Sequence, residues 1–307
     1  MSETSSLQPA SPVRAGSRHR VGIAALVLVT VVWGTTFPAM KAMSGDLQAL
    51  EIISLRFAVA CAVLWPFLRG VQAHELRWGL LMGAVMFGAT ALQVSGLGLT
   101  SSNRNAFITG LNVVIVPLLA AGLGQRLGWP VLAGAALSVV GMYGLFYEAA
   151  PWSFGDTLTL ASAFVYAVYV LLFEYCARSP VRCRPERLAA VQAVVMLGLG
   201  GVGVAWQGGV PAEVLARAED HLLPLIYLGL LASAGIVWLQ AWGQARVRAV
   251  EAALIYGLEP VFASLTAIWY INEVLAGRAL IGAALIVLGV MLSQWPARAP
   301  DAEAARV

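Results

Sequence analysis

The chain has 307 residues, of which 60% are hydrophobic and only 11% charged, and its formal net charge is +3. Soluble domains carry about a quarter charged residues, so this composition excludes an ordinary soluble globular protein. The basic residues lie between apolar stretches rather than in one patch, so the charge does not indicate nucleic-acid binding.

Apolar stretches recur along almost the whole chain, and each is long enough to cross the ~30 Å hydrocarbon layer of a bilayer as a helix. We therefore predict an all-α integral membrane protein with ten transmembrane helices. Their expected ranges are 21–43, 48–69, 77–99, 102–124, 130–147, 155–177, 187–206, 222–244, 250–271 and 277–295.

Polar residues flank these helices and suggest an orientation. Residues 1–20 are rich in Ser, Pro and Arg and are expected to form a disordered cytoplasmic tail, with a second tail at 297–307. If the N-terminus is cytoplasmic, fourteen arginines lie on that side and three on the other: Arg104, Arg217 and Arg278. This bias predicts a multi-pass protein with both termini in the cytoplasm. The near-exclusive use of arginine and the high alanine content suggest a GC-rich bacterial genome, so we expect the inner (plasma) membrane.

The chain also repeats itself. "GAALSVVG" (134–141) and "GAALIVLG" (282–289) are identical at six of eight positions. At a similar offset of 147 residues, Gln93 pairs with Gln240. We therefore expect two copies, 21–148 and 153–296. Because each has five spans, the second enters the membrane from the opposite side, which predicts two inverted five-helix repeats around a central cavity.

Three features together resemble the drug/metabolite transporter superfamily, EamA type: "WGTTFPAMK" (33–41), "GLEPVFASLTAIWYINEVLAGRALIGAALIVLGVML" (257–292) and the duplication. The resemblance covers nearly all of 21–295. It implies an alternating-access exporter or permease for small metabolites, amino acids or drugs, with helices 1, 3, 4, 6, 8 and 9 around the cavity. The first copy departs from the pattern, since Asn112 stands where the second has Glu259, and Arg126 where it has Glu273.

Polar and aromatic residues near the middle of the spans are candidates for binding a substrate. Trp33 and Tyr166 form one repeat-related pair, and Asn112 and Glu259 form another. Aromatic faces suit apolar groups or cations, while Asn and Glu supply hydrogen bonds. The candidate cavity residues are Trp33, Phe37, Asn112, Tyr166, Tyr256 and Glu259.

Glu259 stands out because a carboxylate at membrane depth is costly and usually faces a cavity. It could carry a proton or recognise a substrate amine. Alternatively, a protonated Glu259 could satisfy backbone carbonyls that a kink at Pro260 sets free. Pro38 is a second candidate kink, in the first span.

Four further residues are candidates for a gate or pathway: Lys41, Gln93, Gln240 and Glu174. The two glutamines could equally be polar contacts between helices. Lys41 is the only lysine of the chain, and Glu174 is its counterpart in the second copy.

Lys41 has two interpretations. It could anchor the end of the first span by reaching the membrane interface. It could instead face the cavity, where it would attract a substrate carboxylate or pair with Glu51 or Asp46. Arg56, inside the second span, is expected to be paired as well, with Glu51 as the candidate partner.

These features favour a secondary transporter that exports a small metabolite, with an amino acid or similar zwitterion as the first candidate. Broad efflux of drugs or organic cations is the alternative, because it needs Glu259 and the aromatic residues but not Lys41. A membrane-embedded enzyme is disfavoured, since the expected spans contain no histidine. We expect no metal or cofactor, the substrate and the bilayer as partners, protons as a candidate coupling ion, and a monomer or weak homodimer.

Overall fold

A computed structural model describes residues 12–146, 151–271 and 277–294, which form helices joined by short connections. The first elements are α1 (Pro12–Met43), α2 (Ala49–Leu64), η1 (Trp65–Leu68), α3 (Ala73–Leu99), α4 (Ser102–Gly110), α5 (Asn112–Gly122) and α6 (Trp129–Phe146). Those that follow are α7 (Phe154–Ala177), α8 (Pro185–Trp206), α9 (Pro211–Ala218), η2 (Glu219–His221), α10 (Leu222–Gly229), η3 (Leu230–Gly235), α11 (Ile236–Gln244), α12 (Ala249–Tyr256), α13 (Glu259–Ile271) and α14 (Gly277–Ser293).

Eight helical segments in this part of the chain are long and apolar enough to cross a membrane, so the protein is an all-helical, multi-pass membrane protein. The segments predicted at 130–147 and 277–295 contain shorter apolar helices, Trp129–Leu145 and Gly277–Ser293.

The first helix begins earlier than expected. α1 begins at Pro12, so residues 12–20, which were expected in the disordered tail, are helical. Proline suits the first helical position because its φ is already fixed and its missing N–H would be unpaired there. The rest of that tail and the tail at 297–307 lie outside the described residues.

Two of the membrane segments are broken near their middle. α4 and α5 are separated at Leu111, and α12 and α13 at Gly257 and Leu258. In the second break, Pro260 follows Tyr256 by four residues, where its ring would clash with the Tyr256 carbonyl of a continuous helix. As a result, Asn112 and Glu259 are each the first residue of the second half-helix.

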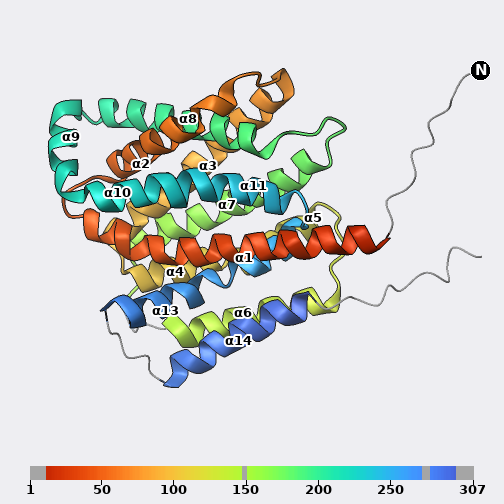
Figure 1. Cartoon of the computed structure of the whole chain (residues 1–307). Coiled ribbons are helices and arrows are strands. Elements are labelled where there is room, and N and C mark those ends of the chain that lie inside the picture. The colour runs from red at the N-terminus through yellow and green to blue at the C-terminus, as the bar shows by residue number, and fades with distance from the viewer. Residues whose placement is uncertain (1–11, 147–150, 272–276, 295–307) are drawn as a thin grey trace, which may run out of the picture.

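The helices pack along one another, with α6 and α14 paired on one side of the molecule and α2 and α8 on the other (Figure 1). A Cβ at Gly141 would lie 2.5 Å from the Gly282 carbonyl oxygen, and one at Gly134 equally close to that of Gly289. The glycines of the repeated octapeptide therefore let α6 and α14 of the same chain pack against each other.

α1 links two opposite ends of the molecule. Near its start, His19 contacts Glu251 at 2.8 Å, and near its end the Lys41 Nζ lies 2.8 Å from the Leu97 carbonyl oxygen. The 22 residues from His19 to Lys41 span about 33 Å of helix, the thickness of a bilayer core. We call these the Glu251 end and the Asp156 end, since Asp156 lies next to Thr100 at the latter.

Candidate binding cavity

A cavity lies between helices that come from both halves of the chain. On α1 its wall runs from Trp33 to Met40, and on α3 from Met86 to Gln93. Both stretches lie between mid-helix and the Asp156 end. The cavity therefore extends from the middle of the molecule toward that end.

Close packing of α1 against α13 sets the geometry of the wall. A Cβ at Gly34 would lie 2.7 Å from the backbone nitrogen of Ala263 and 3.0 Å from the Glu259 carbonyl oxygen. Only glycine allows this approach without a shift of one helix. It places Trp33, the preceding residue, beside the start of α13 and against the cavity.

Three aromatic rings cluster at the inner end of the cavity, in the middle of the molecule. The Trp33 ring lies 5.7 Å from the Tyr166 ring and 5.3 Å from the Tyr256 ring, and the two tyrosine rings are 6.3 Å apart, measured between centroids. These separations are typical of favourable edge-to-face and tilted contacts. The rings come from α1, α7 and α12, so they join helices of both halves around one point.

Behind these rings, toward the Glu251 end, buried glutamines seal the cavity floor. Gln240 Nε2 donates to the Tyr166 hydroxyl at 2.9 Å, and the Tyr256 hydroxyl donates to Gln244 Oε1 at 3.1 Å. Gln244 Nε2 in turn donates to the Val170 carbonyl at 2.6 Å. Both glutamines are at most 1% exposed. Gln240 therefore lies beneath the cavity rather than in its wall.

Glu259 and Asn112 both line the cavity. Among the described residues, no hydrogen bond or ion pair involves the Glu259 carboxylate. The Asn112 amide donates to the Thr109 carbonyl at 2.8 Å, and its buried oxygen has no partner in the described part of the chain. The cavity thus offers the Glu259 carboxylate to a bound molecule.

The remaining predicted wall residues have different surroundings. Phe37 is buried and lines the cavity. Gln93 also lines it and donates to the Thr109 hydroxyl at 3.2 Å. Pro38 is exposed, and α1 runs through it without interruption.

Lys41 lies outside the residues that line the cavity. Its Nζ donates to the carbonyl oxygens of Leu97 at 2.8 Å and Thr100 at 3.1 Å, at the end of α3. The expected pairing with Glu51 or Asp46 is wrong, because Glu51 pairs with Arg217 and Asp46 with His221.

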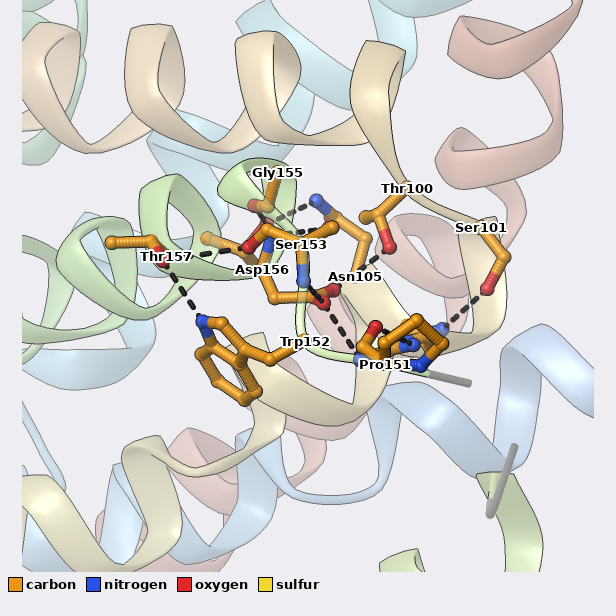
Figure 2. A network of polar contacts seen from close by, with 11 residues as sticks. Thr100, Ser101, Asn105, Pro151, Trp152, Ser153, Gly155, Asp156 and Thr157 are labelled. Atoms are coloured by element: carbon orange, nitrogen blue, oxygen red, sulfur yellow. Dashed lines mark hydrogen bonds and ion pairs between the residues drawn. The ribbon is translucent and has the colours of Figure 1, made fainter. Parts of the chain in front are cut away.

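A buried carboxylate organises the Asp156 end, as Figure 2 shows. Asp156 is fully buried and accepts hydrogen bonds from Arg104 Nη2 at 2.6 Å, Thr100 Oγ1 at 2.8 Å and the Ser153 backbone N–H at 2.7 Å. In turn, the Ser153 hydroxyl accepts a hydrogen bond from the Asp156 backbone N–H, and this capping box fixes the start of α7. Because Arg104 belongs to α4, the network ties α4 to α7.

At the Glu251 end, the contact that α1 makes is partly exposed. His19 of α1 meets Glu251 of α12 at 2.8 Å, with 41% and 21% of their side chains exposed. Glu174, at the end of α7, accepts from the Ala249 N–H at 2.9 Å and pairs with Arg178. It therefore caps the start of α12, away from the cavity.

Arg56 is a charged cavity residue that was not predicted from the sequence to line the cavity. It is 7% exposed, lines the cavity and donates from Nε to Ser233 Oγ at 2.8 Å. The expected pairing with Glu51 is wrong. Five residues of α-helix rotate by about 140°, so Glu51 projects from a different face of α2 and meets Arg217 instead. Two residues of one helix must be three or four positions apart for their side chains to pair.

Fold and cavity define a helical multi-pass membrane protein with a partly polar chamber at mid-depth, the arrangement expected of a membrane transporter. The model of the EamA-like transporter family matches residues 20–147 and 153–295, so the chain belongs to this family. The family resemblance read from the sequence is therefore confirmed.

Relatives with assigned names are transporters. The chain is 30% identical over 288 residues to a "probable terminal-alkyne amino-acid exporter" of Streptantibioticus cattleyicolor, covering 87% of this chain and 91% of the relative. It is 26% identical over 301 residues to a "probable amino-acid metabolite efflux pump" of Escherichia coli, covering 90% and 95%. A protein of known crystal structure, 21% identical, matches with a TM-score of 0.74 over 91% of this chain and 99% of its own, which shows the fold.

Proposed function

We propose that this protein is a secondary active transporter that exports a small metabolite, an amino acid or a related zwitterion, by alternating access. The observation that carries the proposal is the central cavity, which combines an unpaired carboxylate, Glu259, with the rings of Trp33, Tyr166 and Tyr256. The names of two relatives, an amino-acid exporter and an amino-acid metabolite efflux pump, support the substrate class.

Ten spans in two inverted repeats are part of this proposal. The family model matches the chain twice, and the two matched segments contribute corresponding helix crossings. A Cβ at Gly96 of α3 would lie 2.7 Å from the Gly155 carbonyl of α7, and one at Gly243 of α11 would lie 3.3 Å from the Gly22 carbonyl of α1. Gly96 and Gly243 are 147 residues apart, and Gly22 and Gly155 are 133 apart.

The orientation follows from the arginine distribution, which favours cytoplasmic termini and an inner-membrane location. In that orientation the Asp156 end faces outward and the Glu251 end faces the cytoplasm. The cavity then lies on the outer side of a floor formed by Tyr166, Gln240 and Tyr256. Transport requires a second state in which this floor opens while the cavity is closed toward the Asp156 end.

Efflux of organic cations is the second candidate. It is favoured by the same carboxylate and aromatic rings, because both attract a cation. The substrate panel must therefore contain amines without a carboxylate.

Solute counterflow in proteoliposomes tests the proposal directly. Vesicles loaded with one unlabelled amino acid or organic cation at a time are supplied with the labelled solute, with and without a pH gradient. The wild type is compared with Glu259→Gln and with the control Glu213→Gln, an exposed carboxylate on α9. We expect amino-acid counterflow in the wild type and the control. In Glu259→Gln we expect it to fall by about 10- to 100-fold, the effect of losing one charge-assisted hydrogen bond.

The outcomes separate the roles of Glu259. Loss of only the pH-driven component assigns Glu259 to proton coupling, whereas loss of exchange assigns it to the substrate. Exchange of amines alone would replace the amino acid by an organic cation. If folded wild-type protein moved no solute in the panel, the proposed function would be wrong.

A further inference from the structure

Arg56 is a buried cation in the cavity wall without an acidic partner among the described residues. Its Nε donates to Ser233 Oγ at 2.8 Å, its Nη2 to the Ala232 carbonyl at 3.3 Å, and its Nη1 to the sulfur of Met40 at 3.4 Å. None of these acceptors carries a charge, and the thioether is a weak acceptor. Burying a guanidinium in this way is costly unless an anion compensates it.

The hydrogen bonds leave a defined part of the guanidinium available. A guanidinium has five N–H donors, one on Nε and two on each Nη. Three are used, so one N–H on Nη1 and one on Nη2 remain. These two form the edge that binds a carboxylate through two parallel hydrogen bonds.

The surroundings fix the orientation of this side chain. Ser233 and Ala232 belong to η3, a π-helical turn between α10 and α11, and such turns occur frequently at functional sites. The Phe57 ring lies 5.4 Å from the guanidinium carbon. Arg56 is thus held from two sides before any ligand binds, which lowers the entropic cost of binding.

The corresponding position in the second half of the chain lacks this feature. Arg56 is the eighth residue of α2 and Gln192 the eighth residue of α8. Gln192 is fully buried, accepts from the Tyr169 hydroxyl at 2.7 Å and does not line the cavity. A cation therefore faces the cavity from one half only, and it shares the cavity with Glu259 from the other half.

We propose that Arg56 and Glu259 are the two poles of a zwitterion site, in which Arg56 binds the substrate carboxylate and Glu259 its ammonium group. The inference rests on the proposed function and deepens it. The rings of Trp33, Tyr166 and Tyr256 then contact the substrate side chain. The assignment also transfers the carboxylate-binding role from Lys41, which lies outside the wall, to Arg56.

Binding and flux with matched ligands test this assignment. The probes are L-phenylalanine, phenethylamine, which lacks the carboxylate, and 3-phenylpropionate, which lacks the amine. Affinity is measured for purified protein in detergent by ligand-induced thermal stabilisation, and flux by counterflow. The variants are Arg56→Gln, Arg56→Lys, Glu259→Gln and the control Arg69→Gln, an exposed arginine just after η1.

We expect the wild type and the control to bind L-phenylalanine more tightly than either truncated probe. Arg56→Gln should weaken the binding of L-phenylalanine by about 10- to 100-fold and leave the binding of phenethylamine unchanged. Glu259→Gln should weaken the binding of L-phenylalanine by the same factor and leave the binding of 3-phenylpropionate unchanged. Arg56→Lys keeps the charge but not the planar fork, so its loss should be intermediate and confined to ligands with a carboxylate.

Two results would overturn the assignment. One is wild-type protein that binds phenethylamine as tightly as L-phenylalanine. The other is an Arg56 variant that weakens the binding of both ligands by the same factor. Arg56→Lys provides this comparison if Arg56→Gln does not fold. Binding that depends on Arg56 without flux would support the site and contradict the transport proposal. Flux that is indifferent to Arg56 would support transport and contradict the site.

Discussion

The two sides of the aromatic cluster are built from equivalent positions, but they enclose different amounts of space. Gln93 and Thr109 in the first half correspond, 147 residues later, to Gln240 and Tyr256. Gln93 bonds to Thr109 and both line the cavity. On the other side, Tyr256 closes the space above Gln240, which is fully buried. The cavity lies toward the Asp156 end because the side chain there is a threonine rather than a tyrosine.

The polar contacts at the Asp156 end and the contact of α1 at the Glu251 end differ in burial. At the Asp156 end, a fully buried carboxylate accepts from Arg104, Thr100 and Ser153. At the Glu251 end, the contact between His19 and Glu251 is partly exposed. The tight floor therefore adjoins the weaker surface contact, and the cavity adjoins the stronger one. An alternating-access cycle would exchange which side of the cluster is filled.

Exchanging the two unequal residues should give the largest effects. Thr109→Tyr places a ring in the cavity, so we expect counterflow to fall to the level of empty liposomes. Its overpacking cost of about 1–3 kcal/mol should leave the protein folded. The control Thr157→Tyr adds the same ring at an exposed position near the Asp156 end. If Thr109→Tyr transported like this control, the space beside Thr109 would not belong to the pathway.

The converse change, Tyr256→Thr, removes the ring that contacts Trp33 at 5.3 Å. We expect a loss of about 3 kcal/mol in stability, typical of deleting a buried aromatic ring. It should also open the floor. In a background without native cysteines, Gln244→Cys, a fully buried position, should react with a thiol reagent only when Tyr256→Thr is also present. Equal labelling without Tyr256→Thr would show that the ring does not seal the floor.

The contacts at the two ends should differ in strength. Asp156→Asn leaves Arg104 without its buried carboxylate and should cost about 3 kcal/mol. Glu251→Gln removes a partly exposed pair and should cost less than about 1 kcal/mol. Thermal unfolding of both variants in one detergent measures the difference. Equal losses would mean that burial at the Asp156 end does not strengthen the network.

The helical fold could be predicted because long apolar runs and their polar joints report directly on membrane spans. The break before Glu259 follows from Pro260, whose effect on the preceding turn is local. The short helix α9 was not predicted, because its segment carries charges and lies between spans. The early start of α1 was missed for a similar reason, since polar residues can extend a helix beyond the membrane.

The sequence predicted those cavity residues whose position depends on their depth along a membrane span. Trp33, Tyr166, Asn112 and Glu259 are close to the middle of their predicted spans, and all four line the cavity. The role of Arg56 depends on which helix its face meets, and two of its three acceptors, Ser233 and Ala232, lie on η3, 177 and 176 residues away along the chain. Helical spacing alone contains no information about such a partner.

Lys41 should give the smallest effect and tests whether this end of α1 belongs to the pathway. Its ammonium group bonds to two carbonyl oxygens where α3 ends, and a cation is favourable at that end of a helix. Lys41→Gln should therefore lower stability by about 1 kcal/mol and leave counterflow unchanged, and Lys41→Arg should be milder still. If Lys41→Gln instead abolished counterflow while its thermal unfolding matched the wild type, the lysine would act on the substrate. The transport pathway would then include this end of α1.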